Sequence, residues 1–324
     1  MLGLPLEKPL SQKMLNLEQQ IFRQIEKSSS ILIAFPSVGL SGPAGGDTLA
    51  SALAFYLFLK ALGKEVSIAG LSSGADGSAL SFLPSYHDIR RELKNLRRFI
   101  VSIEIGQSKI HNIRYTVDNG KLNFIISPAD GWFRPEDVTA RAGEFQYDLI
   151  ISLGAQELGI FGRAYDENVE FFYNTPVINI DHHSANEEYG QINFLDLNAI
   201  ATCEILFYLF KNYRPDLLSE DITTCLLAGI IQQTKNFKTA NLTPRTLLTT
   251  SELIDRGARR EEIVDHLYRS RDLKSLKLWG RILNNLKSES GGTLLWSSLR
   301  AEDFRDTGAS PDRLTDLVDE LIAN

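Results

Sequence analysis

Continuous apolar runs alternate with longer amphipathic segments along this chain of 324 residues. Short β-branched and aliphatic runs indicate strands buried on both faces, and apolar residues at intervals of three and four indicate helices. The predicted strands lie at 31–35, 65–69, 147–153 and 177–183. The predicted helices lie at 14–28, 48–62, 199–210, 221–232 and 247–256. This order predicts an α/β fold with a mainly parallel sheet flanked by helices.

The pattern changes in the segment 99–130, which we interpret as an antiparallel insert on the sheet. It contains three strand-like runs, at 99–105, 114–117 and 122–126. Asp118-Asn119-Gly120 lies between the last two runs, and Asn-Gly is a strong hairpin signal because both residues tolerate positive φ. The basic segment 89–98 just before the insert is predicted to be a short helix with a solvated, charged face.

The end of the chain has a different organisation from the preceding residues 1–260, which we assign to the α/β domain. Residues 261–290 are charged and helical in pattern, and we interpret them as a helical linker. Residues 291–324 are predicted to form a small unit, with a strand at 293–297 and a helix from Asp312 to the end. About 35 residues cannot bury a core alone, so this unit must pack against another part of the protein.

Composition limits the classes of function. The 34 Lys and Arg residues face 41 Asp and Glu residues, and the net charge of −7 disfavours a general affinity for polyanions. Any nucleic-acid contact must then be local, with the basic residues in 89–98 and the group Arg256, Arg259 and Arg260 as its candidates. Two cysteines give no disulfide framework, and the first thirteen residues do not resemble a signal peptide. No apolar stretch approaches the length of about 18 residues that a membrane span needs, so we expect a cytoplasmic protein without membrane contact.

The strand 177–183 ends in one carboxylate and two imidazoles, Asp181, His182 and His183. Ligands of open α/β sheets bind beyond the carboxyl ends of the strands, which makes this triplet the candidate site. Two adjacent side chains of an extended chain point to opposite sides, so the triplet also fits buried polar residues with a structural role. Asp47 follows the glycine-rich loop 36–46 and, on local evidence alone, is a cap for the helix 48–62.

Several motifs together resemble the DHH phosphoesterase superfamily, in particular its oligoribonuclease and pAp-phosphatase branch, which is similar to the RecJ exonuclease. The resemblance extends over nearly the whole chain. The matching stretches are Asp47 to Leu53, Ile178 to His183 with Asn186 and Asn193, Leu227 to Ile231 with Thr234 and Phe237, Thr243 to Leu247, and Glu252 to Ala258.

The resemblance implies a site for two divalent metal ions, usually manganese, which activate water and clamp the phosphate. It places His182 as a metal ligand, Asp181 beside it to orient the imidazole, His183 toward the scissile phosphate, and Asp47 as a surviving ligand. The other four ligand positions are occupied by Ser41, Gly45, Gly154 and Gln233. Spacing favours neither Glu104 nor Glu157 as a replacement. Hard divalent cations prefer several oxygen donors, so we expect manganese binding to be weak or absent.

The terminal stretch from Thr293 resembles only the beginning of the C-terminal, DHHA1-like domain of active relatives. Their Gly-Gly-Gly-His loop, which grips phosphate or the nucleotide end, does not occur in this sequence. Either a naturally short chain or a fragment would explain this difference. The substrate clamp implied by the resemblance is missing in both cases.

These observations lead to three hypotheses. The first is a catalytically degenerate protein, a pseudoenzyme, whose fold serves binding or regulation. The second is an active metal-dependent phosphodiesterase or phosphatase that acts on short oligonucleotides or nucleotides through a rearranged site. The third is a nucleic-acid or nucleotide-binding module without catalysis. In addition, the insert 99–130 offers strand edges to a partner, either another protein or a second copy of the chain.

Overall fold

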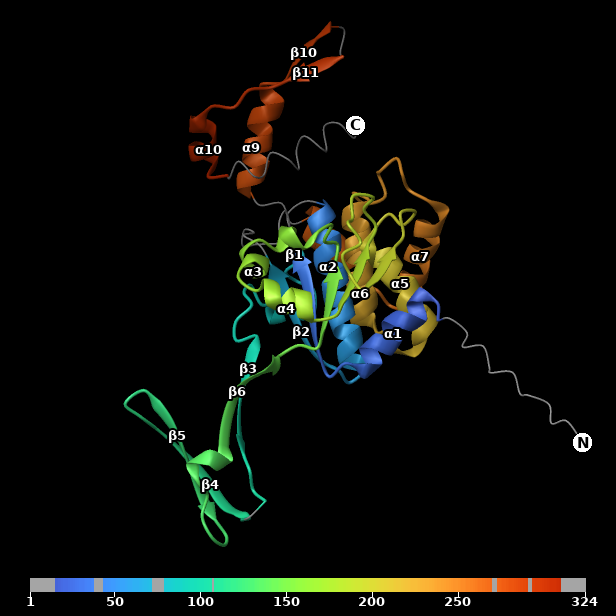
Figure 1. The fold of residues 1–324 in the computed structure, drawn as a ribbon. Helices are drawn as coiled ribbons and strands as arrows, with labels where there is room; N and C mark the ends of the chain where they lie inside the picture. Colours follow the sequence, from blue (N-terminus) through green and yellow to red (C-terminus); the bar gives the residue numbers. More distant parts are fainter. Residues whose placement is uncertain are drawn as a thin grey trace, which may run out of the picture.

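A five-stranded parallel sheet forms the centre of the molecule (Figure 1). The computed structural model describes residues 15–37, 43–71, 79–106, 108–269, 273–290 and 293–309. The sheet has the order β2-β1-β7-β8-β9, and each neighbouring pair is parallel. Its strands are β1 (Ser30–Pro36), β2 (Glu65–Leu71), β7 (Leu149–Leu153), β8 (Val177–Asp181) and β9 (Ile192–Leu195). The predicted fold class is confirmed.

Helices cover both faces of this sheet. Along β1, Ile31, Ile33 and Phe35 face one apolar core, and Leu32 and Ala34 face the other. The first core is formed with α1 (Leu17–Lys27), α2 (Pro43–Ala61), α5 (Thr202–Tyr213) and α6 (Glu220–Gln233). The second core is formed with the shorter helices α3 (Arg163–Asp166) and α4 (Val169–Asn174). Burial on both faces explains why the strands are continuous apolar runs.

The strand order places a switch point between β1 and β7. The chain moves from β1 outward to β2 and later returns to β7 on the other side of β1. Connections leave such neighbouring strands in opposite directions, and the crevice at their carboxyl ends is where open α/β sheets bind ligands. The loops after β7 and β8 meet at this end of the sheet, where Asn186 donates to the Ala155 carbonyl and Thr48 of α2 lies beside Gly154.

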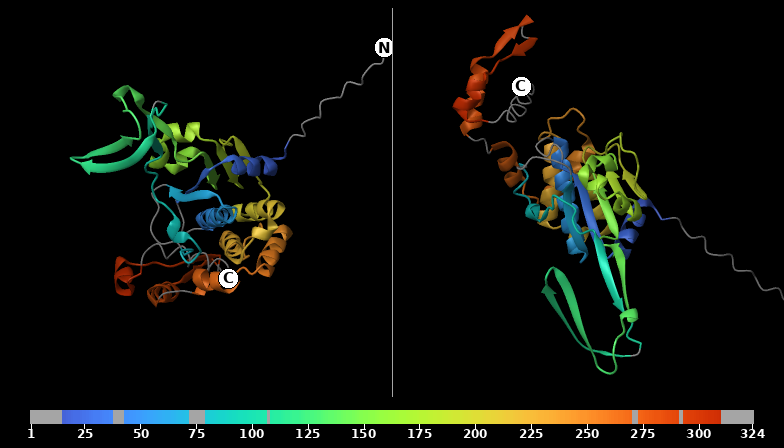
Figure 2. Two further views of the ribbon diagram at one scale, coloured as in Figure 1. Left: turned by 90° about the horizontal axis from the view of Figure 1, so that it is seen from below. Right: turned by 60° about the vertical axis from the view of Figure 1, so that its left-hand side comes forward.

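The insert is not part of the central sheet, in contrast to the prediction. Its strands are β3 (Arg97–Ile103), β4 (Ile110–Asp118), β5 (Lys121–Pro128) and β6 (Val138–Phe145). β3 pairs only with β6, and β4 only with β5, both antiparallel. Figures 1 and 2 show the two ribbons extending away from the body as an arm. The predicted turn is present, since Asn119 and Gly120 have φ of 48° and 75°.

The prediction of a helix at 89–98 is wrong. Arg90 extends along the free edge of β2, where its amide donates to the Ile68 carbonyl and its carbonyl accepts from Gly70. β3 then begins at Arg97. Pairing with an exposed strand edge satisfies the backbone groups that a helix would otherwise satisfy internally, and a charge pattern cannot reveal this choice.

The remaining helices lead to a small terminal unit. α7 (Pro244–Asp255) and α8 (Arg260–Val264) are followed by a π-helical turn at Asp265–Arg269 and then by α9 (Leu273–Asn284). α9 packs with β10 (Lys287–Glu289), β11 (Leu294–Trp296) and α10 (Ala301–Thr307) around Leu278 and Ile282. Residues 273–290 of the predicted linker therefore belong to the terminal unit. The predicted helix from Asp312 lies outside the described residues.

Short 3-10 turns complete the secondary structure, at Tyr86–Asp88, Pro135–Asp137, Leu158–Phe161 and Pro215–Leu217. Within the described segments, no helix combines the length and apolar composition needed to cross a membrane.

Candidate functional site

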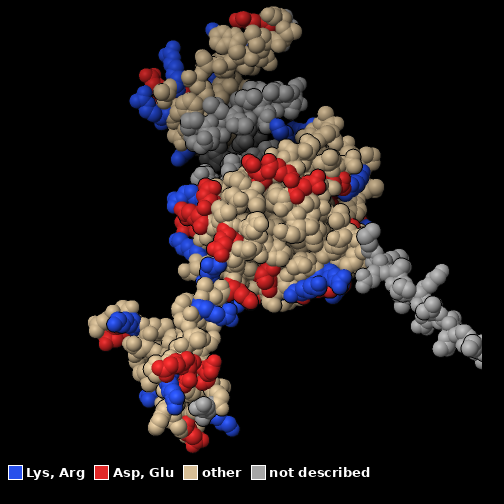
Figure 3. Space-filling view, in the orientation of Figure 1, with Lys and Arg blue, Asp and Glu red and all other residues tan. Residues whose placement is uncertain are grey.

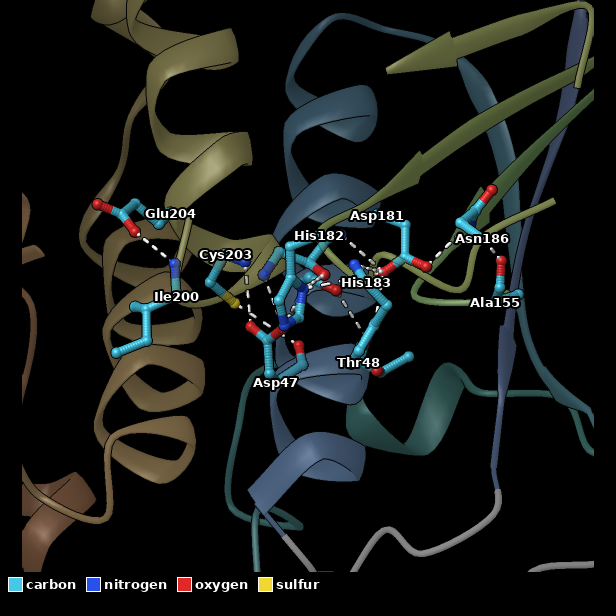
Figure 4. A network of polar contacts seen from close by, with 12 residues as sticks. Asp47, Thr48, Ala155, Asp181, His182, His183, Asn186, Ile200, Cys203 and Glu204 are labelled. Atoms are coloured by element: carbon cyan, nitrogen blue, oxygen red, sulfur yellow. Dashed lines mark hydrogen bonds and ion pairs between the residues drawn. The ribbon is translucent and has the colours of Figure 1, made fainter. Parts of the chain in front are cut away.

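The candidate site lies where β8 ends and where α2 and α5 begin (Figure 4). Asp181 is the last residue of β8 and is fully buried. Its Oδ1 accepts hydrogen bonds from the His182 amide and from His183 Nδ1, both at 2.7 Å, and its Oδ2 accepts one from Asn186 Nδ2 at 2.9 Å. Burial raises the pKa of Asp181, but the hydrogen bonds from His183 and Asn186 outweigh it and hold the pKa below its ordinary value.

The two histidines lie on the same side of the chain, with ring centroids 4.1 Å apart. They do not point in opposite directions because β8 ends at Asp181, so the alternation of an extended strand no longer applies to them. The His182 side chain is 9% exposed, and its Nδ1 lies 3.1 Å from Thr202 Oγ1 and 3.9 Å from Asp47 Oδ2. The His183 side chain is 29% exposed.

Asp181 therefore orients His183 rather than His182. Its Oδ1 lies 2.7 Å from His183 Nδ1 but 3.8 Å from His182 Nδ1. The hydrogen bond with Asp181 raises the pKa of His183, whereas burial lowers the pKa of His182. The two neighbouring imidazoles are thus tuned in opposite directions. With Nδ1 of His183 donating to Asp181, its Nε2 is the nitrogen left for other partners.

Asp47 caps a helix, but not the one that the sequence suggested. It lies inside α2, which begins at Pro43, and its side chain is fully buried. Its Oδ2 accepts from the Thr202 amide at 2.7 Å and its Oδ1 from the Cys203 amide at 3.0 Å. These are the first two amides of α5, whose N-cap residue Ala201 has no side-chain acceptor. Both carboxylate oxygens of Asp47 therefore accept hydrogen bonds from backbone amides that are 155 and 156 residues away in the sequence.

Of the four positions that the resemblance assigns to replaced ligands, the structure describes Gly45, Gly154 and Gln233. Gly154 has φ of +60°, and a Cβ there would lie 2.6 Å from Thr48 Oγ1 and 3.0 Å from Thr48 Cγ2. Gln233 ends α6, and its buried Oε1 has no hydrogen-bond partner within the described part of the chain. Gly45 is buried in the first turn of α2, and Ser41 lies outside the described residues.

The residues present do not fit a centre for two hard divalent cations. Asp181, His182 and His183 offer ligand atoms within 4.8 Å of one another, and among the described residues they form the one such group. Two of the three donors are imidazoles, and the single carboxylate already accepts three short hydrogen bonds. Two hard cations need several oxygen donors and compensating negative charge, which this set does not supply. Glu104 lies just beyond β3 in the arm, and Glu157 is exposed outside the group.

Thr202 and Glu204 are site residues that sequence reasoning missed. Thr202 contacts the His182 ring, and the fully buried Glu204 accepts from the Ile200 amide at 3.0 Å. Arg245 Nε lies 3.3 Å from Glu204 Oε1, yet burial still raises the pKa of Glu204. The contacts of Thr202 with His182 and of Arg245 with Glu204 join segments distant in sequence, which no local pattern connects, whereas Ile200 and Glu204 are only four residues apart.

The basic residues considered for nucleic-acid contact are largely engaged within the chain. Arg259 forms ion pairs with Glu220, Asp221 and Glu262. Arg256 pairs with Glu252, and Arg97 with Glu170. Such pairs lower the local positive potential that would attract phosphate.

Comparison with known proteins identifies the family. The sequence profile described as "DHH family, N-terminal domain" matches residues 43–230, which include Asp47, Asp181, His182 and His183. The chain belongs to the DHH family. The matched segment begins with α2 and ends in α6, so it contains the whole arm and four of the five strands of the central sheet, whereas β1 precedes it.

Similar DHH-family proteins include two bacterial enzymes. The chain is 34% identical over 136 residues to the bifunctional oligoribonuclease and PAP phosphatase NrnA of Thermus thermophilus, a match of 42% of this chain and 40% of that protein. It is 26% identical over 148 residues to the protein of the same name from Bacillus subtilis, covering 45% and 46%. The chain thus spans less than half of the length of the curated relatives that it matches.

A solved structure shares the fold. An exopolyphosphatase-related protein from Bacteroides fragilis superimposes with a TM-score of 0.66 at 18% identity, covering 92% of this chain and 73% of that one.

Proposed function

We propose that this DHH-family, phosphoesterase-like chain is a catalytically degenerate member whose fold serves binding or regulation. One observation carries the proposal: both carboxylate oxygens of Asp47 accept backbone hydrogen bonds at the start of α5. A carboxylate held in this way, with no exposed surface, is a structural cap rather than an available metal ligand.

The surroundings of Gly154 support the same conclusion. A bridging carboxylate at this position would need a Cβ where Thr48 lies, in a left-handed conformation that side chains rarely adopt. With Gln233 in place of a third carboxylate, the negative charge that two cations require is absent from these positions. Manganese binding is expected to be weak or absent, and activation of water by two metals is lost.

A cytoplasmic location is part of this proposal. Cys203 and Cys225 are both free and buried. Burial raises the pKa of each thiol, which keeps them protonated and unreactive, as is usual for structural cysteines in a reducing compartment.

A second candidate function is favoured by the pair of Asp181 and His183. His183 is partly exposed, and the hydrogen bond with Asp181 raises its pKa, which favours the protonated imidazole that a general acid needs to donate to a leaving group. In that case the chain would hydrolyse nucleotides or short oligonucleotides, the substrates that the names of its bacterial relatives imply.

Calorimetric titration of manganese into the full chain and its His182→Ala variant tests both candidates. Hydrolysis of a dinucleotide and of PAP is then measured for the same two proteins. If the chain is catalytically degenerate, no manganese binding should depend on His182, and the wild type and His182→Ala should show equal background hydrolysis. Binding and turnover that both disappear in His182→Ala would overturn it and favour the second candidate. A His182→Asn variant, which keeps a polar side chain beside Thr202, separates loss of a ligand from a packing defect.

A further inference from the structure

The arm formed by residues 97–145 carries exposed apolar faces on its two ribbons. In the β4–β5 hairpin, Ile113, Tyr115 and Val117 lie on one face of β4 because they alternate along the strand. Their partners across the ladder are Ile126, Phe124 and Leu122. All six side chains on this face are apolar, whereas the pairs between them on the other face include Thr116 with Asn123 and Arg114 with Ile125.

The β3–β6 ribbon has the same two-sided character. Phe99, Val101 and Ile103 occupy one face of β3, opposite Ala142, Ala140 and Val138 of β6. The other face carries Ser102 opposite Thr139 and Ile100 opposite Arg141. A period-two apolar pattern in paired strands is typical of a face that packs against another layer of protein.

Within the described residues, nothing covers these faces. None of the arm residues between Arg97 and Glu144 belongs to an apolar core of the body or of the terminal unit. Phe99, Tyr115, Phe124 and Trp132 are between 54% and 75% exposed. An isolated two-stranded ribbon is at best marginally stable in water, so an amphipathic one of this length requires a cover.

The exposed area of the β4–β5 face supports an interface. Each aromatic side chain has roughly 150–250 Å² of surface, so Tyr115 and Phe124, which are 71% and 54% exposed, together present roughly 200–300 Å² per copy. The aliphatic residues Ile113, Val117 and Leu122 on the same face are between 54% and 72% exposed and add to this area. A standard interface buries about 800 Å² on each partner.

Charge favours a second copy of the chain as the cover. Residues 97–145 contain seven Lys and Arg and six Asp and Glu, which gives the arm a net charge of +1. Because the whole chain has a net charge of −7, the residues outside the arm carry −8. Figure 3 shows both signs side by side along the arm, with uncharged surface between them. Two arms can therefore meet without like-charge repulsion, while the strongly negative bodies stay apart.

The place of the arm in the molecule excludes the described terminal unit as its cover. Figures 1 and 2 show the arm and the α9–α10 unit at opposite ends of the body. We propose that the arm is a homodimerisation element, in which the apolar face of β4–β5 packs against the same face of a second copy. An isologous contact of this kind needs only one self-complementary patch, which this face provides.

Analytical ultracentrifugation over a dilution series tests the proposal on the full chain. The wild type is expected to be a dimer that dissociates on dilution. The double variant Tyr115→Lys/Phe124→Glu changes one opposed pair on the apolar face and is expected to weaken dimerisation about 100-fold or more, as loss of an aromatic interface centre does. The matched control Thr116→Lys/Asn123→Glu introduces the same charges in the adjacent pair on the polar face and is expected to leave dimerisation within about threefold.

A wild type that stays monomeric at every concentration would overturn the proposal, as would a dimer that survives Tyr115→Lys/Phe124→Glu. Hydrogen exchange of the unaltered chain gives a readout that does not depend on the variants. Amides of β4 and β5 should exchange more slowly as the protein concentration rises, and those of β1 should not change. Exchange in β4 and β5 that is independent of concentration would contradict homodimerisation through this face.

Discussion

His183 and its neighbour His182 differ in the direction of their pKa shifts, and this difference has consequences for stability. The pKa of His183 is raised by Asp181, so its contribution to stability is fully present below its ordinary pKa and is lost as the pH rises through the raised value. The pKa of His182 is lowered by burial, so its contribution is present above its ordinary pKa and is lost as the pH falls through the lowered value.

We expect the variants His183→Gln and His182→Gln to respond oppositely to pH. The loss of stability in His183→Gln should be larger at about pH 5.5 than at about pH 9, and the order should be reversed for His182→Gln. Urea unfolding of the wild type and both variants at the two pH values measures the differences. A pH dependence of the same sign for both variants would contradict the assignment of Asp181 to His183.

Gly154 gives a second prediction at the residue scale. Gly154→Ala is expected to cost about 2–5 kcal/mol of unfolding free energy, from the left-handed φ of +60° together with the overlap of the new Cβ with Thr48. Gly63→Ala is a matched control because Gly63 also has positive φ, +74°, but no atom within 4 Å of a new Cβ. The control should lose only the backbone part, about 1–2 kcal/mol.

A Thr48→Ala replacement in the Gly154→Ala background separates the two causes. It removes the hydroxyl and methyl groups that the new Cβ would meet, so the double variant should lose less stability than the sum of the single variants. Chemical denaturation of the four proteins measures the coupling. If the losses of unfolding free energy in Gly154→Ala and Thr48→Ala were strictly additive, Thr48 would not be in contact with the new Cβ at position 154.

At the scale of elements, Asp47 joins α2 to the start of α5. Asp47→Ala leaves the amides of Thr202 and Cys203 buried without acceptors, so we expect a loss of about 2–5 kcal/mol. The capping box of α1, formed by Asn16 and Gln19, is exposed and provides the comparison. Asn16→Ala should cost about 0.5–2 kcal/mol.

Urea unfolding measures both losses, without and with manganese. Because Asp47 acts as a cap, its effect should be the same under both conditions. An Asp47→Ala loss no larger than that of Asn16→Ala, or one that appears only with manganese, would contradict the role of Asp47 as the cap of α5.

At the scale of the whole molecule, body and arm are separate packing units. Arg97 and Phe145 are partners in the β3–β6 ladder, so a short Gly-Ser linker can replace residues 98–144. The body's unfolding free energy at low protein concentration should change by less than about 1 kcal/mol, because the excised residues contribute no side chain to its cores. Calorimetry of the two proteins tests this independence, and a body that no longer unfolds cooperatively would refute it.

The sequence by itself determined the elements whose signals are local. Ser30–Pro36 and Val177–Asp181 are recognisable as buried strands because both faces of a central parallel strand are covered, which leaves a continuous apolar run. Asn119-Gly120 specified the hairpin, since few other residue pairs adopt two successive positive φ values. The Asp-His-His triplet marked the end of the sheet where the candidate site lies.

Only the tertiary structure decided what the site residues contact. Asp47 binds backbone 155 residues away, and Asp181 selects His183 over His182 by a difference of about one ångström in distance. Arg90 pairs with the edge of β2, where the sequence had predicted a helix. The strands of the insert pair with one another in the arm and not with the central sheet. Hydrophobic patterning indicates which face of a helix or strand must be buried. The residues that bury it are distant in the sequence, so their identity depends on the whole fold.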